Sequence, residues 1–360
     1  MLRYAELLAE SQGKPREEAL VDYYGASYGT VLGATFASLY PNRVGKFLID
    51  AVVDSEDYYF GNWSQNILQA DASVDAFFEY CAKAGPACAL YKNGSTTSDI
   101  KQRVDAILQD VEKNPIPVTD PNFVQVPTTV SHVDVRGLIM IAMYNPPALW
   151  PTLASRLLEL EARNGSIVAL SSQKGALPAS ECDNRSVKAE SQTSKLVIAC
   201  NDNNKHFDGS ESSLVDLFKY DQELSSYFGE LWAVVIVPVC RNLNTTPPEN
   251  QLFPKFEKVK TRTPILFADN VLDPVTSSYD KMAAFYEDSV ILKQDAVGHG
   301  LIVTTSKCTS DYVQQYFKTG ELPPPNTICE TDFAPFATSP SVKKRGLQQH
   351  HAFLPRWNTY

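Results

Sequence analysis

The sequence predicts an α/β protein, in which a parallel sheet domain is interrupted by a large and mainly helical insertion. Three observations predict it. A strand, helix, strand order spans residues 20–53, the length of a parallel crossover unit. Helical periodicity dominates residues 56–260, and apolar strand segments return at 264–268 and 289–293. We therefore expect a sheet domain formed by residues 1–55 and 261–336, a cap at 56–260 and a disordered tail at 337–360.

The first 55 residues contain the predicted crossover unit. Residues 1–12 have the pattern of an amphipathic helix, and the Gly13 to Pro15 stretch ends it. A short strand is expected from Leu20 to Tyr24, followed by a glycine-flanked turn and a helix that Pro41 stops. The apolar segment from Val44 to Val53 is the next strand.

The cap and the closing segment show helical spacing. Apolar residues recur at intervals of three and four from Ile100 to Val111 and again from Leu153 to Leu160. Strands are expected at 264–268 and 289–293, and the segment from Ser306 to Lys318 is predicted to form the last helix.

Charge and composition exclude several classes of function. The net charge of the 360 residues is -10, and such an acidic chain lacks the basic surface that holds phosphate backbones, so no nucleic-acid partner is expected. The longest strongly apolar run, Trp232 to Val239, is too short to span a bilayer. With 5 histidines, the chain offers little for a metal cluster, and we expect neither a metal nor a cofactor.

The segment Gly25-Ala26-Ser27-Tyr28-Gly29 fits the G-x-S-x-G nucleophile elbow. A serine between a strand and a helix must adopt a strained backbone, and glycine at both flanking positions removes the clash with neighbouring side chains. The motif follows a predicted strand and opens a predicted helix. This context indicates that Ser27 is a catalytic nucleophile.

A nucleophilic serine needs a base, and the base needs an acid that orients it. In folds with this elbow, the chain order is serine, acid, histidine. Asp273 follows the strand predicted at 264–268, and His299 follows the strand at 289–293. Both residues are thus expected at the carboxyl ends of strands, where open α/β sheets place their sites.

Each of these residues also has an interpretation without a catalytic role. An aspartate before proline is often only a turn residue, and a histidine between glycines is often only a loop residue. The rival acids are weaker, because Asp269 lies too close to its strand and Asp295 precedes His299 by only four residues. The other histidines lie in the cap or the tail, namely His132, His206, His350 and His351.

Cysteines and glycosylation sequons point to an oxidising compartment. Of the 7 cysteines, Cys81 and Cys88 bracket a turn-rich hexapeptide, and Cys308 and Cys329 bracket a helix followed by glycine and prolines. Sequons occur in polar, turn-like stretches at Asn62, Asn93, Asn164, Asn184 and Asn244. The first ten residues, in contrast, carry charges and do not form a signal peptide.

Several stretches together resemble the tripeptidyl aminopeptidase-like serine hydrolases of the α/β-hydrolase fold, which are relatives of prolyl aminopeptidases. The resemblance covers about residues 2–336, and it rests on the following segments: Tyr24–Thr30, Tyr40–Val44, Asp50–Asp54, Phe77–Cys81 with Cys88–Leu90, Thr263–Thr276, Tyr316–Pro323 and Thr327–Asp332. It implies an α/β-hydrolase fold with the cap inserted between the nucleophile strand and the acid strand.

The resemblance also implies roles for individual residues. Ser27 would be the nucleophile, Asp273 the acid and His299 the base, and the Tyr28 N–H would supply one donor of the oxyanion hole. It implies secretion and three disulfides. The pairs Cys81–Cys88 and Cys308–Cys329 rest on spacing as well, whereas Cys200–Cys240 rests mainly on the resemblance and leaves Cys182 as the odd thiol.

The chain departs from the family pattern at its front. It begins at the helix before the elbow strand, whereas relatives have further strands there and a glycine-rich loop that completes the oxyanion hole. We therefore expect an α/β-hydrolase fold that lacks its first strands. Such a chain would be poorly soluble or nearly inactive.

The expected function is that of a serine hydrolase without a cofactor, an exopeptidase that releases short peptides from free N-termini. Two alternatives stay open. One is an ester, lactone or thioester hydrolase of fungal secondary metabolism, since the triad chemistry is the same. The other is a truncated, non-catalytic remnant. The sequence does not decide the oligomeric state.

Overall fold

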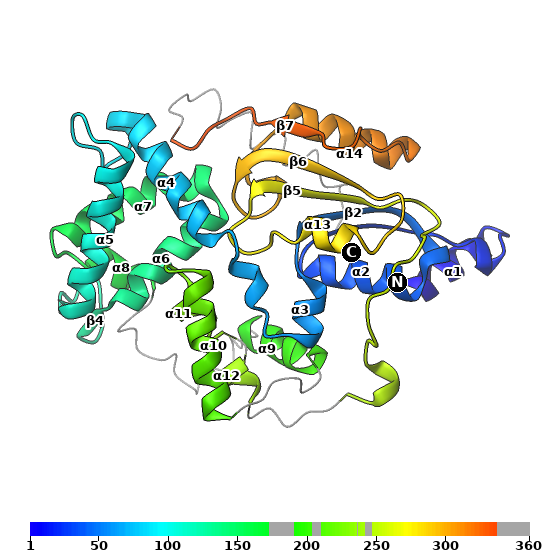
Figure 1. The fold of residues 1–360 in the computed structure, drawn as a ribbon, viewed down its shortest axis with the longest axis horizontal. Helices are drawn as coiled ribbons and strands as arrows, with labels where there is room; N and C mark the ends of the chain where they lie inside the picture. The colour runs from blue at the N-terminus through cyan, green and yellow to red at the C-terminus, as the bar shows by residue number, and fades with distance from the viewer. Residues whose placement is uncertain (173–190, 204–209, 236, 242–246, 337–360) are drawn as a thin grey trace.

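The structure is a computed structural model that describes residues 1–172, 191–203, 210–235, 237–241 and 247–336 (Figure 1). Some residues singled out from the sequence lie outside this part. They are Cys182, Asn184, His206, Asn244 and the expected tail at 337–360, with His350 and His351.

The centre of the sheet domain is a parallel sheet of five strands in the order β1-β2-β5-β6-β7. The strands are β1 (Val21–Ser27), β2 (Val44–Val52), β5 (Leu266–Leu272), β6 (Val290–Val297) and β7 (Ile328–Glu330). Within the described residues, β1 is an edge strand whose only partner is β2. The fold is that of an α/β-hydrolase, with a mostly parallel sheet and flanking helices.

Helices cover both faces of this sheet because its strands are apolar on both sides. One face carries Phe47 and Ile49, which pack against α2 (Tyr28–Leu39) and α13 (Tyr279–Ala283). The other face carries Leu48 and Leu266, which pack against α14 (Lys307–Thr319). The amphipathic helix α1 (Leu2–Ser11) precedes β1 in the chain and lies on the right in Figure 1.

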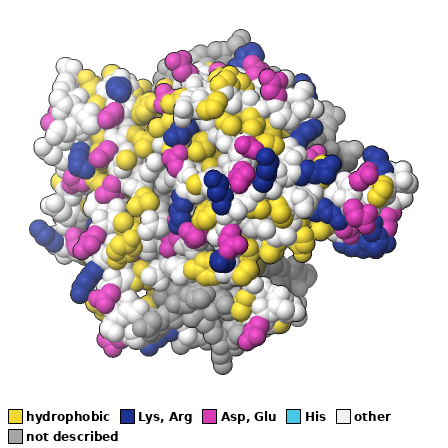
Figure 2. Space-filling view, turned by 45° about the vertical axis from the view of Figure 1, so that its right-hand side comes forward, with side chains coloured by type: hydrophobic (Ala, Val, Ile, Leu, Met, Phe, Trp, Pro, Cys, Tyr) yellow, Lys and Arg dark blue, Asp and Glu magenta, His cyan; other side chains and the backbone are white. Residues whose placement is uncertain are grey.

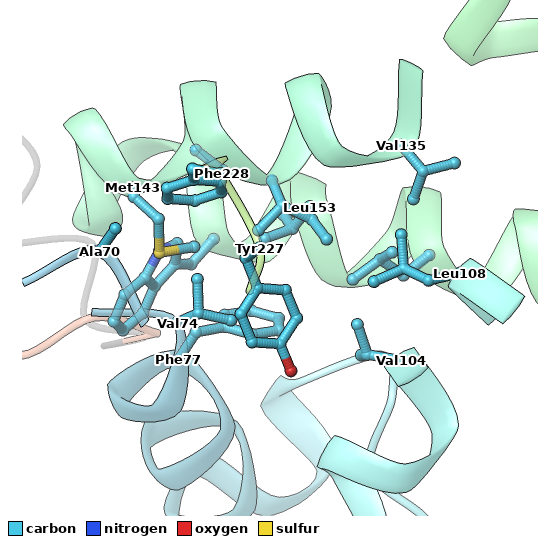
Figure 3. Packing of buried hydrophobic residues seen from close by; sticks show 14 of the residues in the cluster. Ala70, Val74, Phe77, Val104, Leu108, Val135, Met143, Leu153, Tyr227 and Phe228 are labelled. Atoms are coloured by element: carbon cyan, nitrogen blue, oxygen red, sulfur yellow. The ribbon is translucent and has the colours of Figure 1, made fainter. Parts of the chain in front are cut away.

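Between β2 and β5 the chain forms a mainly helical lobe, which occupies the left and the bottom of Figure 1. Its long helices meet in a buried cluster that includes Val74, Phe77, Val104 and Leu153 (Figure 3). The helices are α3 (Ser55–Phe60), α4 (Ala70–Ala84), α5 (Thr97–Lys113), α6 (His132–Tyr144), α7 (Pro146–Glu161), α8 (Ser166–Ser171), α9 (Ser191–Asp202), α10 (Glu211–Leu224), α11 (Gly229–Trp232) and α12 (Val237–Cys240).

The structure adds elements that the sequence pattern does not predict. A short hairpin of β3 (Ile116–Val118) and β4 (Thr128–Val130) lies within the helical lobe. Strand β7 joins the sheet beside β6 although it has only three residues. Strand β1 continues three residues beyond the predicted end at Tyr24, so the strand reaches the nucleophile candidate itself.

Three disulfides are present: Cys81–Cys88, Cys200–Cys240 and Cys308–Cys329. These are the pairs that the resemblance implies. The first closes the end of α4, the second ties α9 to α12, and the third clips α14 to β7. Disulfides of this kind persist in oxidising compartments, so they indicate an extracellular or secretory fate.

Removing the Cys308–Cys329 disulfide should lower the free energy of unfolding by about 3 kcal/mol, because the bond closes a loop of 21 residues in the unfolded chain. Urea unfolding of the Cys308→Ser/Cys329→Ser double variant measures this loss. Full reduction of the wild type should destabilise it at least as much. Equal midpoints for the wild type and the double variant would show that the bond does not form.

On the face drawn in Figure 2, basic and acidic side chains of the described residues are intermingled. Among the described residues, no helix combines the length and the apolar character that crossing a bilayer requires.

Candidate active site

Ser27 occupies a sharp turn from strand to helix. Strand β1 ends at Ser27, and α2 begins at the next residue, so no loop separates the two. The backbone of Ser27 has φ 56° and ψ -125°, a left-handed conformation that costs a non-glycine residue about 1–3 kcal/mol. Strain of this kind at a serine is the backbone signature of a nucleophile elbow.

Close approaches around the turn explain the glycine at position 25. A side chain at Gly25 would place its Cβ 2.5 Å from the carbonyl oxygen of Gly29, so no other residue fits there without a shift of the backbone. The Tyr23 hydroxyl donates a hydrogen bond of 2.7 Å to the same carbonyl oxygen. The start and the end of the motif therefore lie in close contact, and Ser27 stands between them.

Asp273 directly follows β5 and is completely buried. Its Oδ1 accepts hydrogen bonds from the backbone N–H groups of Val275 (2.9 Å) and Thr276 (2.8 Å). Its Oδ2 accepts from the Thr276 hydroxyl (2.9 Å) and from the Gly300 N–H (3.2 Å). These donors fix the carboxylate in one orientation and compensate for its burial.

His299 lies beside this carboxylate. Its Nδ1 is 3.0 Å from Asp273 Oδ2 and 3.1 Å from the Thr276 hydroxyl, and its side chain is 15% exposed. The His299 N–H donates to the Tyr144 carbonyl (3.0 Å), and the Tyr144 ring packs edge-on against the imidazole. Burial opposes the charged imidazolium, but the charge and hydrogen bond of Asp273 and the charge of Asp50 raise the pKa of His299 above its usual value.

The strand register brings Ser27 and His299 to the same end of the sheet, where the carboxyl ends of the strands lie. Ser27 pairs with Val52 at the end of β2, and a Cβ placed at Gly300 would lie 3.3 Å from the side chain of Ala51. No hydrogen bond joins the Ser27 hydroxyl to His299 in the described part of the chain. Bonds between a nucleophile and its base often tighten only when substrate binds.

The backbone N–H of Tyr28 lies in the first turn of α2. The first N–H groups of a helix have no partner within the helix, and Tyr28 is the first residue of α2. The Tyr28 side chain extends to the helical lobe, where its hydroxyl donates to Asp202 (3.0 Å). The Tyr58 hydroxyl donates to the same Oδ2 atom (2.8 Å). Burial raises the pKa of Asp202.

The rival residues lie elsewhere. Asp269 is buried inside β5, where it accepts from the N–H groups of Val52 and Asn270. Asp295 is exposed on β6, and His132 pairs with Glu230 (3.1 Å) in the helical lobe. None of these three contacts the Asp273–His299 pair through a hydrogen bond. Within the described residues, no group of three or more histidine, cysteine or acidic side chains could hold a metal ion.

Two polar residues near the pair were missed by the sequence analysis. The Asn270 side chain donates to the carbonyl oxygens of Gly298 and Gly300, both at 2.8 Å, and thereby brackets His299. Asp50, in β2, accepts the Leu301 N–H. A signal was available, because fully buried parallel strands are nearly all apolar and a polar residue within one needs an explanation.

Comparisons with known proteins agree with this fold. Residues 225–329 match the family described as TAP-like protein, and this region contains both Asp273 and His299. The chain is 24% identical over 320 residues to the serine protease Hip1 of Mycobacterium tuberculosis (strain H37Rv). It is 25% identical over 308 residues to the putative hydrolase YuaR of Escherichia coli (strain K12).

These alignments cover most of this chain but little more than half of each relative. The match to Hip1 takes in 85% of this chain and 57% of the relative, and the match to YuaR takes in 81% and 54%. The chain therefore spans about half of the length of the curated relatives that it matches.

Proposed function

We propose that the chain is a serine hydrolase that uses Ser27, His299 and Asp273 as its catalytic triad, and the match of residues 225–329 to the TAP-like family supports this proposal. The observation that carries this proposal is the strained serine at the end of β1, on the same sheet edge as the hydrogen-bonded Asp273–His299 pair. No cofactor takes part in the proposed reaction.

In the proposed mechanism, the Ser27 hydroxyl attacks the substrate carbonyl while His299 Nε2 takes its proton. Asp273 holds the Nδ1 proton of His299 and stabilises the imidazolium that forms. The tetrahedral intermediate places its oxyanion at the Tyr28 N–H. His299 then protonates the leaving group, which leaves the acyl group on Ser27. In the second half of the reaction, water attacks the acyl carbonyl while His299 takes its proton, and His299 returns this proton to the Ser27 oxygen as the acid product leaves.

For the substrate, we propose peptides with a free N-terminus, from which the enzyme releases short pieces. An exopeptidase of this kind needs an anion that pairs with the substrate ammonium near the nucleophile. Asp202 suits this role because it belongs to the helical lobe and is hydrogen-bonded to the side chain of Tyr28, the residue after Ser27. The comparison adds support, because the relative Hip1 is named a serine protease.

Replacing Asp202 should affect charged and neutral substrates differently. We expect Asp202→Asn to lower kcat/KM about 10- to 100-fold for peptides with a free N-terminus, mainly through KM, because the charge-assisted pair is lost. For N-acetylated peptides and simple esters, the variant should have the same kcat/KM as the wild type. Asp216→Asn is the matched control, since this carboxylate lies on α10 with its side chain 79% exposed. Equal losses for both substrate classes would contradict the proposed ammonium site.

The experiment that tests the whole proposal combines an active-site probe with a substrate panel. A fluorophosphonate should label the protein at Ser27, as peptide mapping would show. The panel contains peptides with free and blocked N-termini, esters, lactones and thioesters. Turnover of esters or lactones alone would favour a role in metabolite hydrolysis. No labelling and no turnover would overturn the proposal and leave a non-catalytic protein.

We also propose that the protein works outside the cytosol and is glycosylated. The three disulfides support an extracellular or secretory location. Three of the sequon asparagines, Asn62, Asn93 and Asn164, are exposed and therefore accessible to a glycan.

A further inference from the structure

Asp50 is a buried acidic residue that the proposed mechanism does not use. It lies in β2, where it pairs in register with Ala26 of β1 and with Ala268 of β5, and its exposed fraction is 0%. Ile49 and Val52 of the same strand are apolar and belong to the core. A carboxyl group at such a place is costly unless it has partners and a role.

The partners of Asp50 connect the two sides of the candidate active site. Asp50 Oδ2 accepts a hydrogen bond of 2.9 Å from the Tyr24 hydroxyl on β1, three residues before Ser27. The Leu301 N–H donates to Asp50 Oδ1 (3.0 Å) and Oδ2 (3.3 Å), two residues after His299. One side chain therefore contacts both the strand that leads to the nucleophile and the turn that carries the base.

The turn that carries His299 has a glycine on each side of the histidine, and it packs closely on its surroundings. Gly298 and Gly300 have φ values of 127° and 78°, which side-chain-bearing residues rarely adopt. A Cβ at Gly300 would lie 3.4 Å from Asp50 Oδ1, so the turn packs directly on this carboxyl group. Asn270 holds the two glycine carbonyls, and Asp50 holds the next N–H.

We propose that Asp50 is a positioning residue for His299, which fixes the turn by accepting the Leu301 N–H and places a second carboxylate within electrostatic reach of the imidazole. This inference rests on the proposed function only for its effect on turnover. The link between Asp50 and His299 is a property of the fold and can be measured without any substrate.

The electrostatic setting supports the proposal. Burial raises the pKa of Asp50 to about 6, although the hydrogen bonds from Leu301 and Tyr24 and the charge of His299 act in the opposite direction. Three other titratable groups lie close enough to Asp50 and His299 to affect their charges: Asp273 and Asp269 of the β5 region and Tyr144 of α6. Above pH 6, Asp50 is mainly ionised and stabilises the imidazolium form of His299.

The test is a titration of the histidines by NMR, with His299 assigned through His299→Gln. In Asp50→Asn, the shape of the side chain is kept but its charge is lost, so the pKa of His299 should fall by roughly 0.5–1 units. Asp54→Asn is the matched control, because Asp54 is a buried carboxylate just beyond β2 that binds Lys281 and has no contact with the turn. Its His299 titration should match that of the wild type.

A milder variant covers the case that Asp50→Asn does not fold. Tyr24→Phe removes a hydrogen bond that favours ionised Asp50, so it should shift the titration of His299 in the same direction by a smaller amount. A His299 pKa that is unchanged in every folded variant would overturn the proposal.

Turnover gives the second readout. In Asp50→Asn we expect kcat to fall about tenfold with an unchanged KM, and the acid limb of the pH profile to move to lower pH with the pKa of His299. If the wild type neither turns over substrates nor reacts at Ser27, the proposed function fails, and the titration still decides the role of Asp50. An unchanged kcat in folded Asp50→Asn, with an active wild type, would contradict the positioning role.

Discussion

Replacing Ser27 by alanine should abolish nearly all hydrolysis, with a loss on the order of 10⁴-fold or more. The side chain supplies the atom that attacks the substrate carbonyl, and no neighbouring group can take over this bond. Alanine keeps the Cβ of serine, so the left-handed backbone at the end of β1 costs about as much as before. The variant should therefore fold as the wild type does, and initial rates with the best peptide substrate measure the loss.

A matched control lies on the helix that follows. Ser38 of α2 is hydrogen-bonded to the Tyr286 hydroxyl and lies away from the sheet edge with the triad candidates, so Ser38→Ala should keep its activity and its fluorophosphonate labelling. Combining Ser27→Ala with His299→Ala should add little to the single loss, since the two residues act as one unit. Full activity in a folded Ser27→Ala preparation would show that another residue is the nucleophile.

The sequence predicts the elements of this fold well where local signals are strong. Pro41 lies two residues after Leu39, where α2 ends, and the apolar segments at 264–268 and 289–293 overlap β5 and β6. The sequence does not predict β7, because three residues carry no usable periodicity and the strand is defined by its pairing with β6.

The candidate site shows the same division between local and long-range information. Ser27 could be singled out because its signal, two glycines around a serine at a strand-to-helix turn, is local. Asp273 and His299 followed from their positions after strands. Asp50 and Asn270 act through backbone groups that are 251 and 28–30 residues away in the chain, and no local pattern reports such contacts. Asp202 likewise meets Tyr28 only through the fold.

Replacing Asp273 by asparagine should also reduce kcat on the order of 10⁴-fold, although the change is only one of charge and donor capacity. An amide group in place of Oδ2 would point its N–H atoms at His299 Nδ1, which must then accept rather than donate. The imidazole proton would move to Nε2, where it blocks uptake of the Ser27 proton. The same amide would face the N–H of Gly300, so we expect the free energy of unfolding to fall by about 1–3 kcal/mol.

The matched control for this change is Asp295→Asn, because Asp295 precedes His299 by four residues but is exposed on β6 and should tolerate the amide. Turnover at saturating substrate, together with urea unfolding of both variants, separates the two effects of Asp273→Asn. A variant that stays folded in the assay loses no rate through its lower free energy of unfolding. The whole loss of kcat in folded Asp273→Asn therefore reports the role of the carboxylate in the reaction. If folded Asp273→Asn keeps kcat within tenfold of the wild type, Asp273 is not the acid. Asp50 would then be the next carboxylate to replace, because it also lies within electrostatic reach of His299.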